Sequence, residues 1–237
     1  MEHARIVELA DAILARRTAL QKTTTTTTPT TSTSTPHHTQ YWIGVAGPPG
    51  SGKSTLVQDL VTEFNTSRHL TAIGIPMDGY HYTRHELDQM SDPAAAHRFR
   101  GAPFTFNGVQ FVSDLNTAKA QGCFSFPGFD HAAKDPVSEV HVLDKSCDLV
   151  IVEGNYLLLE ELPWSGCRSV FDETMYIQCA LPELKRRLAA RHMAAWGWTE
   201  EQAMERIEDS DALNMLTVQN SFQGVERATT VVVSSMV

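Results

Sequence analysis

The stretch GPPGSGKST, from Gly47 to Thr55, constrains this chain more than any other, because it joins two segments with the marks of regular structure. The apolar run YWIGVAG precedes it as a short strand, and an apolar pattern at helical spacing follows it. The spacing Gly-x-x-x-x-Gly-Lys-Ser in this setting is a Walker A motif. Its glycines let backbone N–H groups turn toward phosphate oxygens, and the positive end of the following helix faces the same anion. The motif predicts a loop that holds a nucleoside triphosphate.

Two side chains of this loop have expected chemical roles. Lys53 is expected to reach the outer phosphates, and the Ser54 hydroxyl is expected to bind Mg²⁺. ATP and Mg²⁺ are the predicted cofactors. The residues expected to bind the nucleotide are Gly47, Pro48, Pro49, Gly50, Ser51, Gly52, Lys53, Ser54 and Thr55.

Strand-like and helical patterns alternate along the chain from Tyr41 onward. Short apolar runs occur at 41–47, 69–77, 148–154, 173–181 and 228–236, and helical patterns occur at 181–196 and 199–216. Strands that alternate with helices are typical of a parallel sheet covered on both faces. The sequence predicts an α/β fold of the P-loop NTPase type, with a mainly parallel five-stranded sheet, helices on both faces and a helical lid.

The region before Tyr41 divides into two parts. Residues 1–22 place apolar side chains on one helical face, which predicts a helix packed on the core. Residues 23–40 are rich in threonine and have no apolar periodicity, so we expect a disordered insertion there. The pair His37 and His38 in this insertion is assigned no metal role. Residues 41–237 form the predicted P-loop domain.

Composition excludes several classes of partner and compartment. The chain has 237 residues and a formal net charge of -9, which disfavours nucleic acid or an anionic membrane as the main partner. The four cysteines show no metal-ligand spacing and are expected to be reduced and mostly buried. No apolar run is long enough to span a bilayer, and the acidic N-terminal segment is unlike a secretory signal. These features predict a cytoplasmic protein.

Two acidic residues follow or end predicted strands on the same edge as the Walker A loop. Asp78, in IPMDGYHY, can accept a proton from a substrate hydroxyl that attacks the γ-phosphate. An aspartate that merely caps the turn before Gly79 is the alternative interpretation. Glu153 ends the apolar run DLVIVEG and has the position of a Walker B acid that holds Mg²⁺ or its water.

The helical segment LKRRLAARH carries three arginines. Arg187 and Arg191 are four residues apart and share a helical face, and Arg186 is adjacent to the first. Such a face could close over the triphosphate and neutralise charge in the transition state. A solvated basic face is the alternative. The sequence does not decide which of these arginines is catalytic.

Five stretches, in this order along the chain, resemble the phosphoribulokinase/uridine kinase family of P-loop kinases. They are GPPGSGKST, MDGYHY, RGAPFTFN, FPGFDHAAKDPV and VIVEGNYLLL, and the similarity is greatest to a branch labelled pantothenate-kinase-like or fructose-transport-system kinase. The resemblance implies that Asp78 is the catalytic base and Glu153 the Walker B acid. It also implies that Arg100, Asp130 and His131, with Lys134 beside them, lie in the segments that contact the phosphate acceptor.

Other residues near these segments remain candidates for the acceptor site. His81 and Tyr156 lie at the predicted edge of the sheet and could face the acceptor. Asn107 departs from the family pattern, because an aspartate is expected after TF and an amide cannot carry its negative charge. This difference could change affinity for the acceptor.

The motifs favour a kinase over two other classes. A P-loop ATPase or switch without an acceptor is one alternative, but the N-K-x-D motif of GTPases and the signature of ABC-type motors are absent. A nucleotide-binding regulatory protein that has lost catalysis is the other, but Lys53, Ser54, Asp78 and Glu153 are all present. The expected partner is a small-molecule substrate with a hydroxyl group. Related kinases are often dimers or tetramers, so the resemblance leaves a homo-oligomer open.

Overall fold

A computed structural model describes residues 3–26, 39–130, 132–222 and 230–233. The helices are α1 (His3–Thr26), α2 (Lys53–Thr62), α3 (Arg84–Asp88), α4 (Pro93–Arg98), α5 (Gly108–Gln121), α6 (Leu181–Trp196), α7 (Glu200–Arg206) and α8 (Ala212–Phe222). The strands are β1 (Tyr41–Ala46), β2 (Ala72–Pro76), β3 (Phe124–Asp130), β4 (Asp135–Leu143), β5 (Leu149–Gly154), β6 (Glu173–Gln178) and β7 (Thr230–Val233). Short 3₁₀ or π turns add η1 (Glu63–Ser67), η2 (Met77–Tyr80), η3 (Pro103–Thr105), η4 (Trp164–Ser169) and η5 (Ile207–Asp211).

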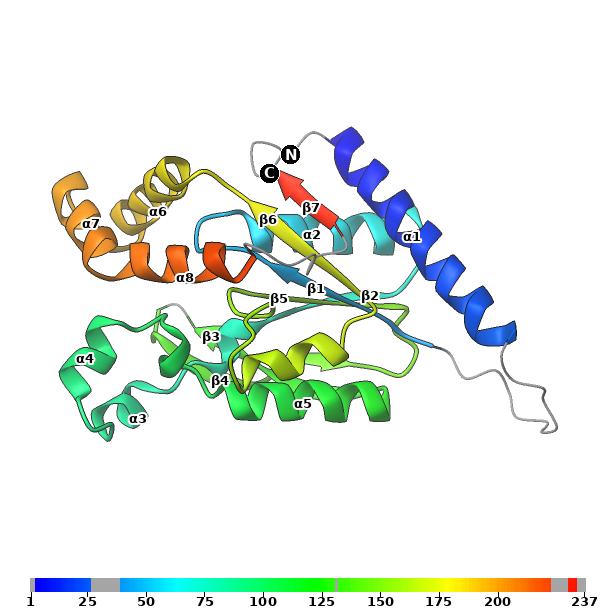
Figure 1. Cartoon of the computed structure of the whole chain (residues 1–237), viewed down its shortest axis with the longest axis horizontal. Coiled ribbons are helices and arrows are strands. Elements are labelled where there is room, and N and C mark those ends of the chain that lie inside the picture. Colours follow the sequence, from blue (N-terminus) through cyan, green and yellow to red (C-terminus); the bar gives the residue numbers. More distant parts are fainter. Residues whose placement is uncertain (1–2, 27–38, 131, 223–229, 234–237) are drawn as a thin grey trace.

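Five strands form a parallel sheet in the order β2-β5-β1-β6-β7, as predicted. The central strands are buried on both faces, which explains their continuous apolar character. Successive side chains of β1 enter opposite faces: Trp42 joins the core beneath α5 and η4, and Ile43 joins the core beneath α1 and α2. Helices therefore cover both faces of the sheet (Figure 1).

The N-terminal helix packs on the core through the predicted face. Ile6, Ala10 and Ile13 are buried in the same cluster as the side chains of α2. The helix ends at Thr26, four residues beyond the predicted end, so the first threonines of the tract continue the helix. Residues 27–38, with most of the predicted insertion and the pair His37 and His38, lie outside the described residues.

Two parts of the fold lie beyond the main sheet. Strands β3 and β4 form an antiparallel hairpin that contacts η2, and the sequence analysis did not predict it. Helices α6, α7, η5 and α8 form a subdomain, here called the lid, around the buried side chains of Leu184, Leu188, Ala203, Ile207 and Met215. In Figure 1 the lid and helices α3 and α4 lie at the same end of the molecule.

The cysteines are free thiols, of which Cys147, Cys167 and Cys179 are buried and Cys123 is half-buried. Within the described ranges, the chain has no helix that is long and apolar enough to cross a membrane.

Candidate active site

Three predicted functional segments meet at the carboxyl edge of the sheet because of the strand register. Glu153 in β5 pairs with Val45 in β1 on one side and with Pro76 in β2 on the other. The Walker A loop leaves β1 directly after Ala46, and Asp78 lies two residues after Pro76. Parallel strands present their carboxyl ends on one edge, where ligands bind in folds of this kind.

The Walker A loop needs glycine at two positions for its backbone conformation. Gly50 and Gly52 have φ angles of 80° and 94°, a left-handed region that favours glycine. Helix α2 begins at Lys53, so its first N–H groups face the loop. A methyl group at Gly50 would lie 3.2 Å from the carbonyl oxygen of Leu184, which shows how closely α6 of the lid approaches the loop.

Lys53 lies among charges of both signs. Its Nζ donates a hydrogen bond of 3.1 Å to the carbonyl oxygen of Pro48, across the loop. Burial lowers the pKa of Lys53 to about 8; the negative charges of Glu153 and Asp78 oppose this shift, and the positive charge of Arg191 adds to it. The two carboxylates and Arg191 are therefore close enough to Lys53 to influence its charge.

Ser54 and Glu153 form an oxygen pair that fits Mg²⁺. The Ser54 hydroxyl donates a hydrogen bond of 3.0 Å to Oε2 of Glu153. Burial raises the pKa of Glu153, against the effects of Lys53 and the Ser54 hydrogen bond. Among the described residues, no group of three or more His, Cys, Asp and Glu side chains could hold a metal. This donor set suits Mg²⁺, which usually binds one or two protein oxygens and completes its shell with water and phosphate.

Asp78 lies in the turn η2, which β3 packs against. A methyl group at Gly79 would lie 2.2 Å from the carbonyl oxygen of Pro127, so glycine is required there for the backbones to approach. The dipeptide Asp-Gly therefore has a packing reason for its glycine that is separate from any role of the aspartate. The backbone carbonyl of Asp78 accepts the N–H of His81, at 3.2 Å.

His81 is held by aromatic neighbours and by the same turn. Its ring centroid lies 3.9 Å from that of Phe106 and 4.9 Å from that of Phe129. Its Nδ1 lies 2.8 Å from the carbonyl oxygen of Asp78, and because a carbonyl only accepts, this nitrogen is the donor. His81 thus fixes the turn that carries Asp78.

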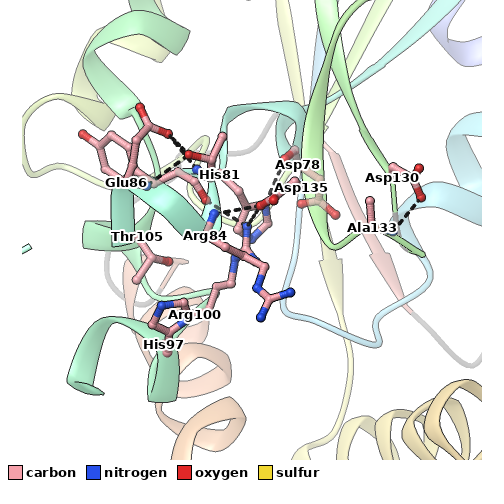
Figure 2. A network of polar contacts seen from close by, with 12 residues as sticks. Asp78, His81, Arg84, Glu86, His97, Arg100, Thr105, Asp130, Ala133 and Asp135 are labelled. Carbon is pink, nitrogen blue, oxygen red and sulfur yellow. Dashed lines mark hydrogen bonds and ion pairs between the residues drawn. The ribbon is translucent and has the colours of Figure 1, made fainter. Parts of the chain in front are cut away.

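Arg100 is placed by Asp135, a residue that sequence analysis did not select. Its guanidinium donates to the carboxylate of Asp135 at 3.1 Å and to the carbonyl oxygen of Tyr82 at 2.8 Å, and it lies over the ring of Phe129. The same Asp135 oxygen accepts the backbone N–H of Arg84 at 2.8 Å. Figure 2 shows Arg100, Arg84 and Asp135 converging beside Asp78 and His81.

Three other candidates take mainly supporting positions. Asp130 accepts the N–H groups of Ala132 and Ala133 and so caps the hairpin turn, apart from the Arg100 cluster (Figure 2). Tyr156 is fully buried, and its hydroxyl donates to the carbonyl oxygen of Gly101. Asn107 caps α5 by accepting the N–H of Gln110 at 3.1 Å.

The remaining acceptor candidates are His131 and Lys134. His131 lies outside the described residues. Lys134 extends toward the lid, with its ammonium 5.1 Å from the centre of the Trp196 ring.

The lid arginines differ in their surroundings. Arg186 makes two bonds of 2.7 Å to Glu183, and Arg187 donates to the same carboxylate at 2.7 Å. These bonds lower the pKa of Glu183 to about 2, and the hydrogen bonding from Arg186 makes the largest contribution. Arg191 instead acts on the charge of Lys53. Arg187 also lies beside the Walker A loop, because a methyl group at Gly50 would lie 3.9 Å from its Cβ. Arg187 and Arg191 therefore both remain candidates on the nucleotide side.

Sequence relatives of the chain show its family. It is 36% identical over 189 residues to "Putative uridine kinase C227.14" of Schizosaccharomyces pombe, across 78% of this chain and 80% of that protein. The chain belongs to the P-loop kinase family. It is also 38% identical over 145 residues to the ATP-dependent kinase-like protein notR' of Aspergillus versicolor, across 58% of this chain and 84% of that protein.

A solved structure shows the same fold. YFH7 from Saccharomyces cerevisiae matches with a TM-score of 0.79 at 20% identity, across 96% of this chain and 98% of that one. No family model matches the chain. The predicted fold and the predicted family are thus confirmed, with ATP as the nucleotide that relatives of this kind use.

Proposed function

We propose that this protein transfers the γ-phosphate of ATP to a hydroxyl group of a small metabolite. The observation that carries the proposal is the position of two carboxylates near the Walker A lysine: Asp78, in the turn that follows β2, and Glu153, in the neighbouring strand β5. One carboxylate is hydrogen-bonded to the Ser54 hydroxyl, as a metal-holding acid would be. The other has no side-chain hydrogen bond to a described residue and can act as a base.

The proposed reaction is a direct displacement at the γ-phosphorus of ATP. The acceptor oxygen attacks the γ-phosphorus while its proton passes to the Asp78 carboxylate. The bond between the γ-phosphorus and the bridging oxygen breaks, and ADP leaves with that electron pair. Lys53 and Arg191 are the cations that would stabilise charge on the transferring group. Ser54 and Glu153 would hold Mg²⁺, which neutralises phosphate charge when bound.

The acceptor would lie between η2, the β3–β4 hairpin and the loop 98–106, here called the acceptor-side loop. This region supplies Asp78, His81 and Arg100, with the half-buried Phe129 as apolar surface. Arg100 shares its charge with Asp135. These features suit a polar, hydroxyl-bearing metabolite. The name of the S. pombe relative makes uridine the first acceptor to test.

The test is a panel assay of acceptor-dependent ADP release with ATP and Mg²⁺, with the phosphorylated product identified by mass. The panel holds uridine and other nucleosides, pantothenate, D-glycerate, fructose and sugar phosphates. Asp78→Asn should bind ATP normally and lower the transfer rate by ~10²–10⁴-fold, because an amide cannot accept the proton. Glu86→Gln, which changes an exposed carboxylate of α3, is the control and should retain full activity.

Two results would contradict the proposal. Full transfer by Asp78→Asn would remove the proposed base. ADP release that no acceptor accelerates, at equal rates in the wild type and in Asp78→Asn, would instead support a P-loop ATPase without an acceptor.

A further inference from the structure

Arg206, on α7 of the lid, contacts the acceptor-side loop from more than 100 residues away in the sequence. Its guanidinium donates to two backbone carbonyls of that loop, those of Arg98 and Arg100, the second at 3.4 Å. The side chain is 23% exposed and also lies 3.9 Å from the Asp211 carboxylate. A planar guanidinium can bond two acceptors at once, which an ammonium cannot do with the same geometry.

A second contact joins the same two segments, but here the donor lies on α4 and the acceptor lies in the lid. Arg98 donates through Nε and Nη2 to both carboxylate oxygens of Asp209 in η5, the first bond at 2.7 Å. The two arginines therefore form a reciprocal pair of contacts, here called the clasp, between α4 and the lid. Both ends of the Arg98–Asp209 contact are more exposed than Arg206, so the Arg206 half is less screened by solvent.

The clasp fixes the backbone that carries Arg100. Arg206 binds the carbonyls of Arg98 and Arg100, and the buried Tyr156 binds that of the next residue, Gly101. From this backbone the Arg100 side chain reaches Tyr82 and Asp135 beside the turn of Asp78. Figure 2 shows that Arg100 lies in the cluster with Asp78 and His81. A shift of the loop would therefore displace a group at the proposed acceptor position.

The other end of the lid meets the nucleotide loop. Helix α6 approaches Gly50 through the carbonyl of Leu184, and Arg191 on the same helix acts on the charge of Lys53. The lid is internally connected: His192 of α6 lies 2.9 Å from Asp211 of η5, and Lys185 pairs with Glu208. One body thus contacts the Walker A loop with α6 and the acceptor-side loop with α7 and η5.

We propose that Arg206 is a positioning residue for the acceptor site. Through Arg206, the lid couples the binding of nucleotide at the Walker A loop to the ordering of the backbone at residues 98–106. This proposal rests on the proposed function, since it assigns the loop to the acceptor. Nucleotide that engages α6 would hold the lid in place, and Arg206 would then order the backbone of Arg100. The acceptor site would be complete only when nucleotide is bound.

The test is hydrogen–deuterium exchange of the full chain, with and without the magnesium complex of a non-hydrolysable ATP analogue. In the wild type the analogue should slow amide exchange in residues 98–106 at least tenfold. In Arg206→Ala this slowing should fall below twofold, while the analogue still protects the Walker A loop and binds within twofold of wild-type affinity. Arg206→Lys should restore only part of the effect. Arg168→Ala, an exposed arginine of η4, is the matched control and should behave as wild type.

Two results would overturn the proposal. One is equal protection of residues 98–106 in the wild type and in Arg206→Ala, and the other is no analogue-dependent protection in the wild type. If Arg206→Ala does not fold, Arg206→Lys is tested by the same readout, and undiminished protection of residues 98–106 in that variant overturns the proposal. Once an acceptor is known, Arg206→Ala should raise the KM for the acceptor at least tenfold and leave the KM for ATP unchanged. Failure to phosphorylate any acceptor would contradict the proposed function alone, because the exchange experiment needs no acceptor.

Discussion

The most informative single residue in the candidate site is Lys53, because its charge depends on opposing neighbours. Burial and Arg191 favour the neutral amine, and Glu153 and Asp78 favour the ammonium. The outcome is a pKa of about 8, below the usual value for lysine. A triphosphate at this site would add several negative charges beside the amine. It would therefore raise the pKa of Lys53 back toward its usual value.

Nucleotide binding should consequently take up protons in the alkaline range. Above a pH of about 8 the free protein holds Lys53 partly neutral, and the complex holds it charged, so binding gains a proton. At about pH 8.5 we expect roughly half a proton or more per nucleotide, measured by calorimetry in buffers of different ionisation enthalpy. Asp78→Asn removes a charge that raises this pKa, so uptake should begin at lower pH in that variant. Binding without proton uptake in the wild type would contradict the described environment of Lys53.

At the scale of elements, the site depends on the packing of η2 against the β3–β4 hairpin. Gly79 permits the contact, and its neighbour Asp78 is the proposed base. The hairpin in turn carries Phe129 and Asp135, which contact His81 and Arg100. A change at this junction should therefore affect acceptor turnover more than nucleotide affinity.

Gly79→Ala tests this dependence. The new methyl would lie 2.2 Å from a backbone oxygen, so η2 and β3 must separate, at a cost of about 1–3 kcal/mol in the free energy of unfolding. Acceptor turnover should fall at least tenfold while nucleotide affinity stays within about threefold. Gly197→Ala is the control: Gly197 has a φ of 67°, but its added methyl meets nothing within 4 Å. A Gly79→Ala enzyme with normal turnover would show that this junction does not position the base.

Local patterns predicted the elements that form the sheet and the nucleotide loop. Continuous apolar runs identified the buried parallel strands, and the Walker A spacing identified Lys53 and Ser54. The hairpin was missed because Pro127, Pro136 and several polar residues interrupt any strand pattern. Asp135 and Arg206 were missed for a different reason. Their partners lie 35 and more than 100 residues away, and no local signal marks such contacts.

At the scale of the whole molecule, α1 makes two ion pairs at the amino edge of the sheet, opposite the candidate site. Arg16 pairs with Glu173 at the start of β6, and Arg17 pairs at 2.8 Å with Asp148, directly before β5. The Glu173 side chain has no exposed surface, and its second oxygen accepts the Tyr41 hydroxyl at 3.1 Å. Burial and the charge of Glu173 raise the pKa of Tyr41. Helix α1 therefore supplies the positive charge for a carboxylate buried in the core.

Loss of that charge should destabilise the fold without affecting nucleotide binding, because the two sites lie at opposite edges of the sheet. Arg16→Ala leaves the Glu173 carboxylate buried with two neutral donors, the hydroxyl groups of Tyr41 and Thr230, and no positive charge. Removal of one partner of a buried pair costs about 3–5 kcal/mol, and partial exposure of Arg16 reduces this to about 2–4 kcal/mol in urea unfolding. The double variant Arg16→Ala/Glu173→Gln should recover at least half of the loss, since a neutral amide needs no counter-charge. If Arg16→Ala and the double variant unfold at the same urea concentration, the charge of Arg16 does not stabilise the fold. Helix α1 would then stabilise it through the packing of Ile6, Ala10 and Ile13.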